Sequence, residues 1–235
     1  MKAMFNKEFR GYFNSPTGYI FVGVFLFFCA MFFVNMVIVN QSATLILMFN
    51  SMNLICLFLV AILTMKLWSE EMSRKTDQLL ICSPVSPWGI VMGKYLAACA
   101  VLGVALVFSL IFPVILNIFS NPPLSELISS YLGFILLWCS FIAIGLYISS
   151  LTENQMISAI LTFGVLFVVF LINYLTSTTH TALWIRKIVG AFALLDRYYD
   201  FQLGMVSIPD VIYYFSVIFL FLYLTKQNVV KRRYK

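Results

Sequence analysis

Long stretches without a charged side chain constrain this sequence more than any other feature. Four such intervals are Gly11–Met65, Tyr95–Ser125, Leu127–Thr152 and Asn154–Ile185. Each is longer than the roughly 20 residues that an α-helix needs to cross a bilayer core about 30 Å thick. The 62% share of hydrophobic residues also exceeds the roughly 45–50% of soluble domains, which argues against a large soluble protein with buried helices. The chain is therefore expected to be an all-α polytopic membrane protein.

The charge-free intervals predict six membrane spans in a single transmembrane domain, residues 1–235. The first interval holds two spans because the polar segment Asn35–Thr44 interrupts it. The short run Val211–Thr225 is long enough if Lys226 extends toward the membrane surface and the helix continues past it. The N-terminal run is too long for a signal peptide and lacks a small-residue cleavage site, so the first helix is expected to be retained. The predicted spans are residues 19–39, 46–66, 89–117, 128–150, 156–176 and 210–230.

The distribution of Lys and Arg orients these spans. Basic side chains precede the first span, border the second loop and follow the sixth span: Lys2, Lys7, Arg10, Lys66, Arg74, Lys75, Lys94, Lys226, Lys231, Arg232, Arg233 and Lys235. The exceptions follow the fifth span: Arg186, Lys187 and Arg197. Because Lys and Arg are enriched in cytoplasmic loops, both termini are expected in the cytoplasm, with the protein in a bacterial plasma membrane. The net charge of +6 then reflects topology and contact with anionic lipid rather than nucleic acid.

Residue patterns typical of catalysis or metal binding are missing from the sequence. The single histidine, His180, lies in a polar loop, and none of the five cysteines forms a CxxC pair. We therefore expect no catalytic residue, no metal site and no cofactor held by this chain.

The segment Gly89–Tyr95, GIVMGKY, resembles a phosphate loop only superficially. It has one residue too few between its glycines, and Tyr95 stands where Ser or Thr would hold magnesium. The chain is therefore not expected to be an ATPase. Gly89, Gly93 and Ala97 are better interpreted as a face of small residues for close helix contact.

No acidic or basic residue falls at the centre of a predicted span. Proton-coupled carriers and ion pumps place ionisable groups there despite a cost of several kcal/mol. Their absence argues against proton coupling and against a selective ion pore. If this protein moves a cargo, its energy is expected to come from a partner that docks in the cytoplasm.

The segment Leu67–Trp88, LWSEEMSRKTDQLLICSPVSPW, is the best candidate for such a docking site. A helix that starts at Ser69 would have a hydroxyl N-cap, acidic residues in its first turn, and an i,i+4 ion pair between Glu70 and Arg74. Pro84 would end this helix. An interfacial helix on lipid headgroups and a protein-docking helix both fit this pattern, and the two acids favour docking slightly.

Four segments of the chain, in this order, resemble a known family: KEFRGYFNSPTGYI, LTMKLWSEEMSRKTDQLLICSPVSPWGIVMGKYLAA, AIGLYISSLTENQMISAIL and LLDRYYDFQLGMVSIPDVIYYFSVIFLFLYLT. They are similar to the membrane subunits of ABC-2 type ABC exporters, especially the small permeases that resemble gliding-motility and copper-processing permeases. The resemblance covers nearly the whole chain. One departure is Lys75, where family members commonly have glycine.

The resemblance implies a type-2 ABC exporter fold in which two permeases pair above two separate ATPase subunits that bind ATP and Mg. Residues 1–18 would form an amphipathic elbow helix, and residues 69–83 a coupling helix that enters a groove of the ATPase. The loop between the fourth and fifth spans would make a second contact. The residues implied in ATPase coupling are Glu70, Glu71, Arg74, Lys75, Asp77, Leu79, Leu80, Glu153 and Asn154.

The resemblance also implies a re-entrant or interfacial segment at residues 177–209, on the extracellular side. An ordinary surface loop remains the alternative for this segment. Tyrosine and tryptophan side chains would sit at the membrane interface and the charged residues could pair there. The residues concerned are Trp184, Arg186, Asp196, Arg197, Tyr198, Tyr199 and Asp200.

The predicted bundle interior offers Phe, Met and small residues with few polar groups. Asn35, Asn53 and Asn173 are the candidates for side chains along a transport pathway. This lining suits a hydrophobic or amphipathic peptide better than a sugar or an ion. Export of drugs or lipids by the same machinery, and a non-transporting membrane scaffold, are the alternatives that the sequence leaves open.

Overall fold

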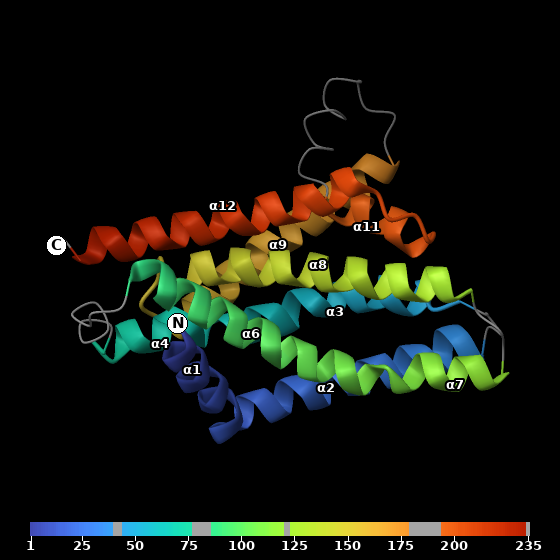
Figure 1. Ribbon diagram of the computed structural model, residues 1–235, viewed down its shortest axis with the longest axis horizontal. Helices are drawn as coiled ribbons and strands as arrows, with labels where there is room; N and C mark the ends of the chain where they lie inside the picture. The colour runs from blue at the N-terminus through green and yellow to red at the C-terminus, as the bar shows by residue number, and fades with distance from the viewer. Residues whose placement is uncertain (40–43, 77–85, 120–122, 179–193, 234–235) are drawn as a thin grey trace.

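The computed structural model describes residues 1–39, 44–76, 86–119, 123–178 and 194–233, and these ranges consist of helices joined by short turns and loops (Figure 1). The elements are α1 Lys2–Asn14, α2 Pro16–Phe32, the π-helix η1 Phe33–Ile38, α3 Ile46–Thr64, α4 Lys66–Ser73, α6 Pro87–Ser109, α7 Ile111–Phe119, α8 Leu124–Ser149, α9 Gln155–Thr178, α11 Leu194–Gln202 and α12 Ile208–Arg233. No strand occurs in the described part of the chain.

Six helical stretches among the described residues are long and apolar enough to cross a bilayer. They are Pro16–Ile38, Ile46–Ser73, Pro87–Ile118, Leu124–Ser149, Gln155–Ile172 and Ile208–Arg232. The prediction of an all-α polytopic membrane protein is confirmed, and each predicted span overlaps one of these stretches.

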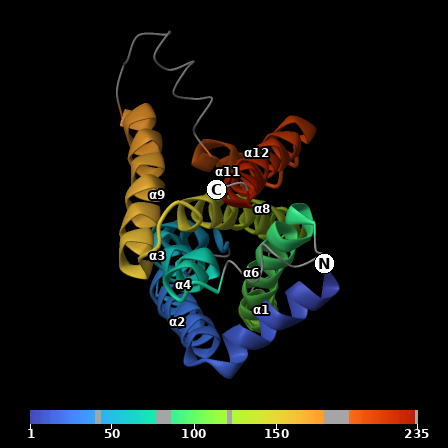
Figure 2. The ribbon, with the colours of Figure 1, turned by 90° about the vertical axis from the view of Figure 1, so that its left-hand side faces the viewer.

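Helix α8 forms the centre of the bundle, as Figure 2 shows. It contacts α3, α4, α6, α9, α11 and α12. Its side chains Leu137, Trp138 and Phe141 are fully buried, and Trp138 lies against Phe25 of α2. The outer faces of α2, α9 and α12 remain largely exposed and apolar, which suits contact with lipid.

Different helices lie at the two ends of the bundle. Helix α1, helix α4 and both chain termini lie at one end, whereas α7 and α11 lie toward the other (Figure 1). An even number of membrane spans returns the chain to the side from which it started, so this placement of the termini follows from the six spans.

Helix α1 is separated from α2 by a sharp bend at Ser15. This residue is extended, with φ −100° and ψ 156°, and Pro16 opens α2 with a φ already suited to a first helical turn. The Tyr12 hydroxyl donates a hydrogen bond of 2.7 Å to the Leu63 carbonyl, which fixes α1 to the end of α3.

Helix α1 also lies across α6, where Gly93 allows a close approach. A Cβ at Gly93 would stand 2.9 Å from the Met4 Cβ, closer than two such atoms can come. The predicted close contact of the small-residue face of α6 is therefore confirmed at Gly93, and its neighbour there is α1.

Candidate coupling site

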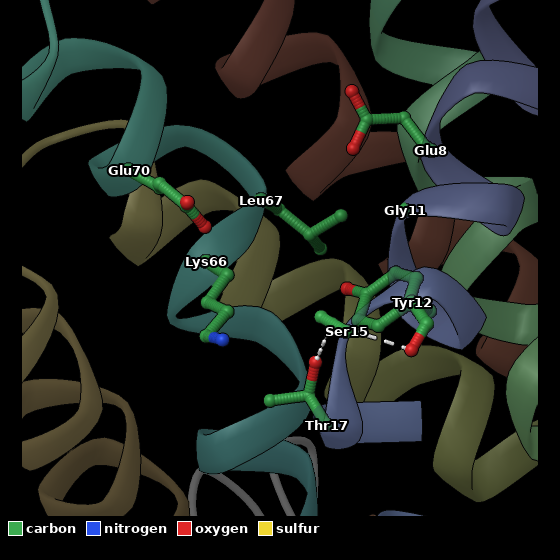
Figure 3. A pocket seen from close by; sticks show the side chains of 8 residues that line it. All are labelled: Glu8, Gly11, Tyr12, Ser15, Thr17, Lys66, Leu67 and Glu70. Carbon is green, nitrogen blue, oxygen red and sulfur yellow. Dashed lines mark hydrogen bonds between the residues drawn. The ribbon is translucent and has the colours of Figure 1, made fainter. Parts of the chain in front are cut away.

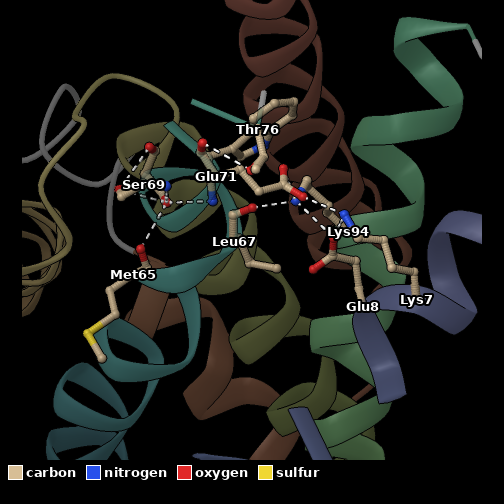
Figure 4. Close-up of polar contacts among 10 residues, drawn as sticks. Lys7, Glu8, Met65, Leu67, Ser69, Glu71, Thr76 and Lys94 are labelled. Atoms are coloured by element: carbon tan, nitrogen blue, oxygen red, sulfur yellow. Dashed lines mark hydrogen bonds and ion pairs between the residues drawn. The ribbon is translucent and has the colours of Figure 1, made fainter. Parts of the chain in front are cut away.

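Helix α4 continues from α3 after a break at Met65 and begins at Lys66. The predicted N-cap at Ser69 is wrong, because Ser69 lies inside the helix and is fully buried. The Ser149 side chain supplies the cap instead: its Oγ accepts hydrogen bonds from the backbone N–H groups of Trp68 (3.1 Å) and Ser69 (3.3 Å). Its hydroxyl lies 3.4 Å from the Met65 carbonyl (Figure 4). A residue 80 positions away thus satisfies N–H groups that every helix start leaves without an intrahelical partner.

Helix α4 ends at Ser73, so the predicted helix over residues 69–83 is helical in its described part only up to that residue. The Thr76 N–H bonds to the Glu71 carbonyl at 2.9 Å, and the Lys75 N–H bonds to the Met72 carbonyl at 3.0 Å. This pair of bonds is the Schellman arrangement, which requires a left-handed residue just after the helix. Lys75 takes that conformation with φ 56°. Asp77, Leu79 and Leu80 lie outside the described residues.

Replacing Lys75 with glycine is expected to stabilise the protein by about 1 kcal/mol. A left-handed conformation costs a side-chain-bearing residue roughly 1–2 kcal/mol, which glycine avoids, although glycine loses more chain entropy on folding. The measurement is the free energy of unfolding in detergent micelles titrated with SDS. Lys75→Ala is the control, since alanine keeps the Cβ, and an equal gain from alanine would contradict this explanation.

Lys94 of α6 is the buried charge of this region, with a side chain only 1% exposed. Its Nζ donates a 2.5 Å hydrogen bond to the Leu67 carbonyl and lies 2.7 Å from Glu71 Oε2 and 3.0 Å from Glu8 Oε1. It also lies 5.0 Å from the centre of the Trp68 ring. One ammonium group therefore joins α1, α4 and α6 (Figure 4).

Both carboxylate oxygens of Glu71 form ion pairs with lysines of this same chain. Its Oε1 lies 2.7 Å from the Nζ of Lys7 on α1, and its Oε2 pairs with Lys94. Burial by itself lowers the pKa of Lys7. The hydrogen bond to Glu71 and the negative charges of Glu71 and Glu8 have the opposite and larger effect, so the pKa of Lys7 is raised above its ordinary value. Lys7 therefore stays charged through neutral pH, and the ion pair is lost only as the pH rises above that pKa. We call Lys7, Glu8, Glu71 and Lys94 the four-charge cluster.

Glu70 and Arg74 lie on the outer side of α4. Their side chains form the predicted i,i+4 ion pair, at 3.0 Å, and the Arg74 side chain is 72% exposed. This part of the prediction is confirmed. Glu70 and Arg74 are therefore open to a partner, whereas Glu71, which was grouped with them, is turned inward.

The loop between α8 and α9 lies next to α4. The Thr152 hydroxyl is 3.5 Å from the Ser69 hydroxyl, and the Asn154 side chain accepts a 2.9 Å hydrogen bond from the Met156 N–H at the start of α9. Glu153 is exposed beside it. The structure thus brings together the two segments that the resemblance assigns to ATPase contact, although the sequence separates them by about 80 residues.

At the other end of the bundle, α11 covers α8. Arg197 of α11 pairs with Asp210 of α12 at 2.7 Å. Tyr198 is fully buried against Phe134 instead of lying at a membrane interface, whereas Tyr199 is exposed. Asp196 and Asp200 are also exposed. Trp184 and Arg186 lie outside the described residues.

The three pathway candidates do not share one location. Asn35 is exposed in η1 and donates a 2.8 Å hydrogen bond to the Met31 carbonyl. Asn53 is buried in α3, and its Oδ1 has no hydrogen-bond partner among the described residues. The side chain of Asn173 lies outside the described set. Sequence reasoning missed Asn50 of α3, whose Oδ1 accepts a 2.9 Å hydrogen bond from Gln202 of α11.

Comparison with known proteins gives one match. Residues 29–185, about two thirds of the chain, match the model of the ABC-2 family transporter proteins. Searches of curated proteins and of solved structures found no matching relative. The matched range holds the last turn of α2 and the helices α3 to α9, including the whole α4 region, whereas Lys7 and Glu8 of α1 lie before it. The chain therefore belongs to the ABC-2 transporter family, and it is a membrane-spanning permease subunit of the kind that associates with ABC ATPase subunits.

Proposed function

We propose that this chain forms, with a second permease and two cytoplasmic ATPase subunits, an ATP-driven export route for hydrophobic or amphipathic peptides. The observation that carries the proposal is the exposed Glu70–Arg74 turn beside the loop 152–155 at one end of the bundle. A partner that contacts both segments would touch α4 and the junction of α8 with α9 at once. ATP and Mg belong to the partner, and this chain supplies the docking surface.

The charge distribution supports a cytoplasmic location for that surface. Helices α1 and α4 and the C-terminal part of α12 lie at the same end of the bundle and carry most of the basic residues (Figure 1). Lys and Arg are concentrated on the cytoplasmic side of membrane proteins. This orientation places the docking surface where an ATPase subunit would meet it.

The four-charge cluster gives a route for force from the ATPase to the spans. When ATP draws the two ATPases together, displacement of the Glu70–Arg74 turn moves α4. Ser149 joins α4 to α8, and Lys94 joins it to α6 and α1, so these helices move with it. The movement opens the pathway only if the ATPase makes different contacts in its two states, because a partner with equal contacts would shift no equilibrium.

The composition of the bundle supports an apolar or amphipathic cargo. The chain contains 24 Phe and 11 Met, and the buried interior is almost wholly aromatic, aliphatic or small. Polar groups such as Asn53 are sparse there. Stimulation of ATP hydrolysis by a panel of amphipathic peptides, drugs and lipids would identify the class of cargo.

The double substitution Glu70→Ala and Arg74→Ala tests the docking assignment. We expect retention of the ATPase on the detergent-extracted permease to fall about tenfold, because exposed charged residues at the centre of an interface can carry about 1.4 kcal/mol. The free energy of unfolding of the permease itself should change by less than about 1 kcal/mol, since the pair lies at the surface, with Arg74 72% and Glu70 30% exposed.

Asp200→Ala at the opposite end of the bundle is the matched control. It should leave both the retention of the ATPase and the free energy of unfolding of the permease unchanged. If the double variant retains its ATPase and hydrolyses ATP at the normal rate, the docking assignment is wrong.

A further inference from the structure

A polar pocket lies between α1, the start of α2 and the start of α4. It has a volume of about 180 Å³ and is lined by Glu8, Gly11, Tyr12, Ser15, Thr17, Lys66, Leu67 and Glu70 (Figure 3). Thr17 stands in the first turn of the span α2, and Lys66 directly follows the span α3. The pocket therefore sits at the depth where two membrane spans meet the aqueous phase, which is the level of lipid headgroups.

The charged groups of the pocket lie on opposite sides of it, and they differ in their distance along the chain from the membrane spans. Lys66, Ser15 and Thr17 adjoin the spans, whereas Glu70 lies one helical turn beyond Lys66 and Glu8 lies two turns before Ser15. In Figure 3 the first group is at the lower side of the pocket and the two acids are at the upper side. A ligand with its negative group toward the membrane and its positive group toward the water would match this order.

Lys66 is the cation of the pocket that has no ion-pair partner among the described residues. Glu8 and Glu70 pair with Lys94 and Arg74, yet each keeps further oxygen lone pairs for another donor. The Ser15 hydroxyl bonds to the Tyr12 carbonyl and to the Thr17 hydroxyl and does not cap α2, so the N-terminal amide groups of that helix add partial positive charge near Lys66. The membrane side of the pocket is thus suited to a phosphate group and the water side to an ammonium group.

An apolar surface continues from the pocket into the membrane. Ile62 and Phe58 lie one and two turns before Lys66 on the same side of the helix, and their side chains are 43% and 53% exposed. Tyr19 and Ile20 are exposed on α2 close to Thr17. A hydrocarbon chain attached to the bound headgroup would lie along this surface, which a water-soluble ligand would not use.

We propose that this pocket binds one phospholipid with a primary-amine headgroup, of the phosphatidylethanolamine type. Its phosphate contacts Lys66 and the hydroxyls of Ser15 and Thr17, and its ammonium donates hydrogen bonds toward Glu8 and Glu70. The bound lipid fills the space between α1 and α4 and steadies α1 against the bundle. Phosphatidylcholine is excluded because its trimethylated nitrogen has no N–H to donate.

Native mass spectrometry of the full-length protein in detergent, with any subunits that co-purify, tests the proposal. The probes are POPE and POPC added at equal concentration. We expect one POPE retained on each chain at about fivefold higher affinity than POPC, the size of effect that a partly exposed charged contact supplies. Lys66→Gln should weaken POPE binding, and Glu70→Gln should remove the preference of POPE over POPC.

Arg74→Gln is the control for Glu70→Gln, because it breaks the same ion pair but does not line the pocket, so it should keep the preference. Lys2→Gln is the control for Lys66→Gln. Equal retention of POPE and POPC by the unmodified protein would overturn the proposal, as would an unchanged preference in Glu70→Gln. Displacement of POPE by free phosphoethanolamine at similar concentration would also overturn it, because the site would then be one for a soluble ligand.

Discussion

Replacing Lys94 with methionine is expected to destabilise the protein by about 3 kcal/mol, because it removes the buried counter-ion of Glu71 and Glu8 and leaves them only the exposed Lys7. Methionine keeps the unbranched shape of the side chain, so the loss reflects charge rather than a cavity. It also removes the hydrogen bond to the Leu67 carbonyl. The measurement is the free energy of unfolding in detergent micelles titrated with SDS.

Two variants separate the charge effect from other causes. Lys7→Met removes the other lysine that contacts Glu71, but that side chain is 58% exposed, so the expected loss is less than about 1 kcal/mol. Adding Glu8→Gln and Glu71→Gln to Lys94→Met should recover much of the loss, since no unpaired buried charge then remains. A triple variant as unstable as Lys94→Met alone would contradict the explanation from charge.

Replacing Gly145 with leucine should destabilise the protein by about 3 kcal/mol or more, since excess volume in a close helix contact costs 1–3 kcal/mol and occasionally more. A Cβ at this position would overlap the Thr64 side chain at the crossing of α8 and α3. Thr64 is held in place because its hydroxyl donates a 2.8 Å hydrogen bond to the Val60 carbonyl. The same unfolding measurement applies.

Gly103→Leu in α6 is the matched control, because a Cβ there would meet nothing within 4 Å. Leucine is also a better helix former than glycine by up to about 1 kcal/mol, so this variant should be neutral or slightly stabilised. A comparable loss of unfolding free energy in both variants would contradict the explanation that Gly145→Leu acts through overlap at the crossing of α8 and α3.

The spans could be predicted from the sequence because their cause is local. A bilayer requires about 20 apolar residues in a row, and the charge-free intervals provide them. The small-residue face around Gly93 and the Glu70–Arg74 ion pair were predictable for the same reason, because each depends on the spacing of residues along one helix.

The start of α4 could not be predicted because its cap comes from Ser149, about 80 residues away along the chain. Ser69 has the residue type of a cap, but its hydroxyl bonds to the Ser149 carbonyl at 3.1 Å inside the bundle. Lys94 was interpreted as a charge that marks the cytoplasmic border. One signal could have identified its burial: its neighbours Ile90, Ala97 and Ala98 on the same helix face are all apolar or small and buried.

The dependence of α4 on Ser149 also has a consequence for biosynthesis. Glu71 can find Lys94 soon after it leaves the ribosome, but the first N–H groups of α4 wait for a residue made about 80 positions later. At about 5–20 residues per second this delay lasts about 4–16 s. During this interval α2, α3 and α6 can already enter the membrane while the proposed surface for the ATPase is incomplete. A nascent chain is therefore expected to complete the proposed docking surface only after α8 has been inserted, so a permease truncated before Ser149 should not bind an ATPase.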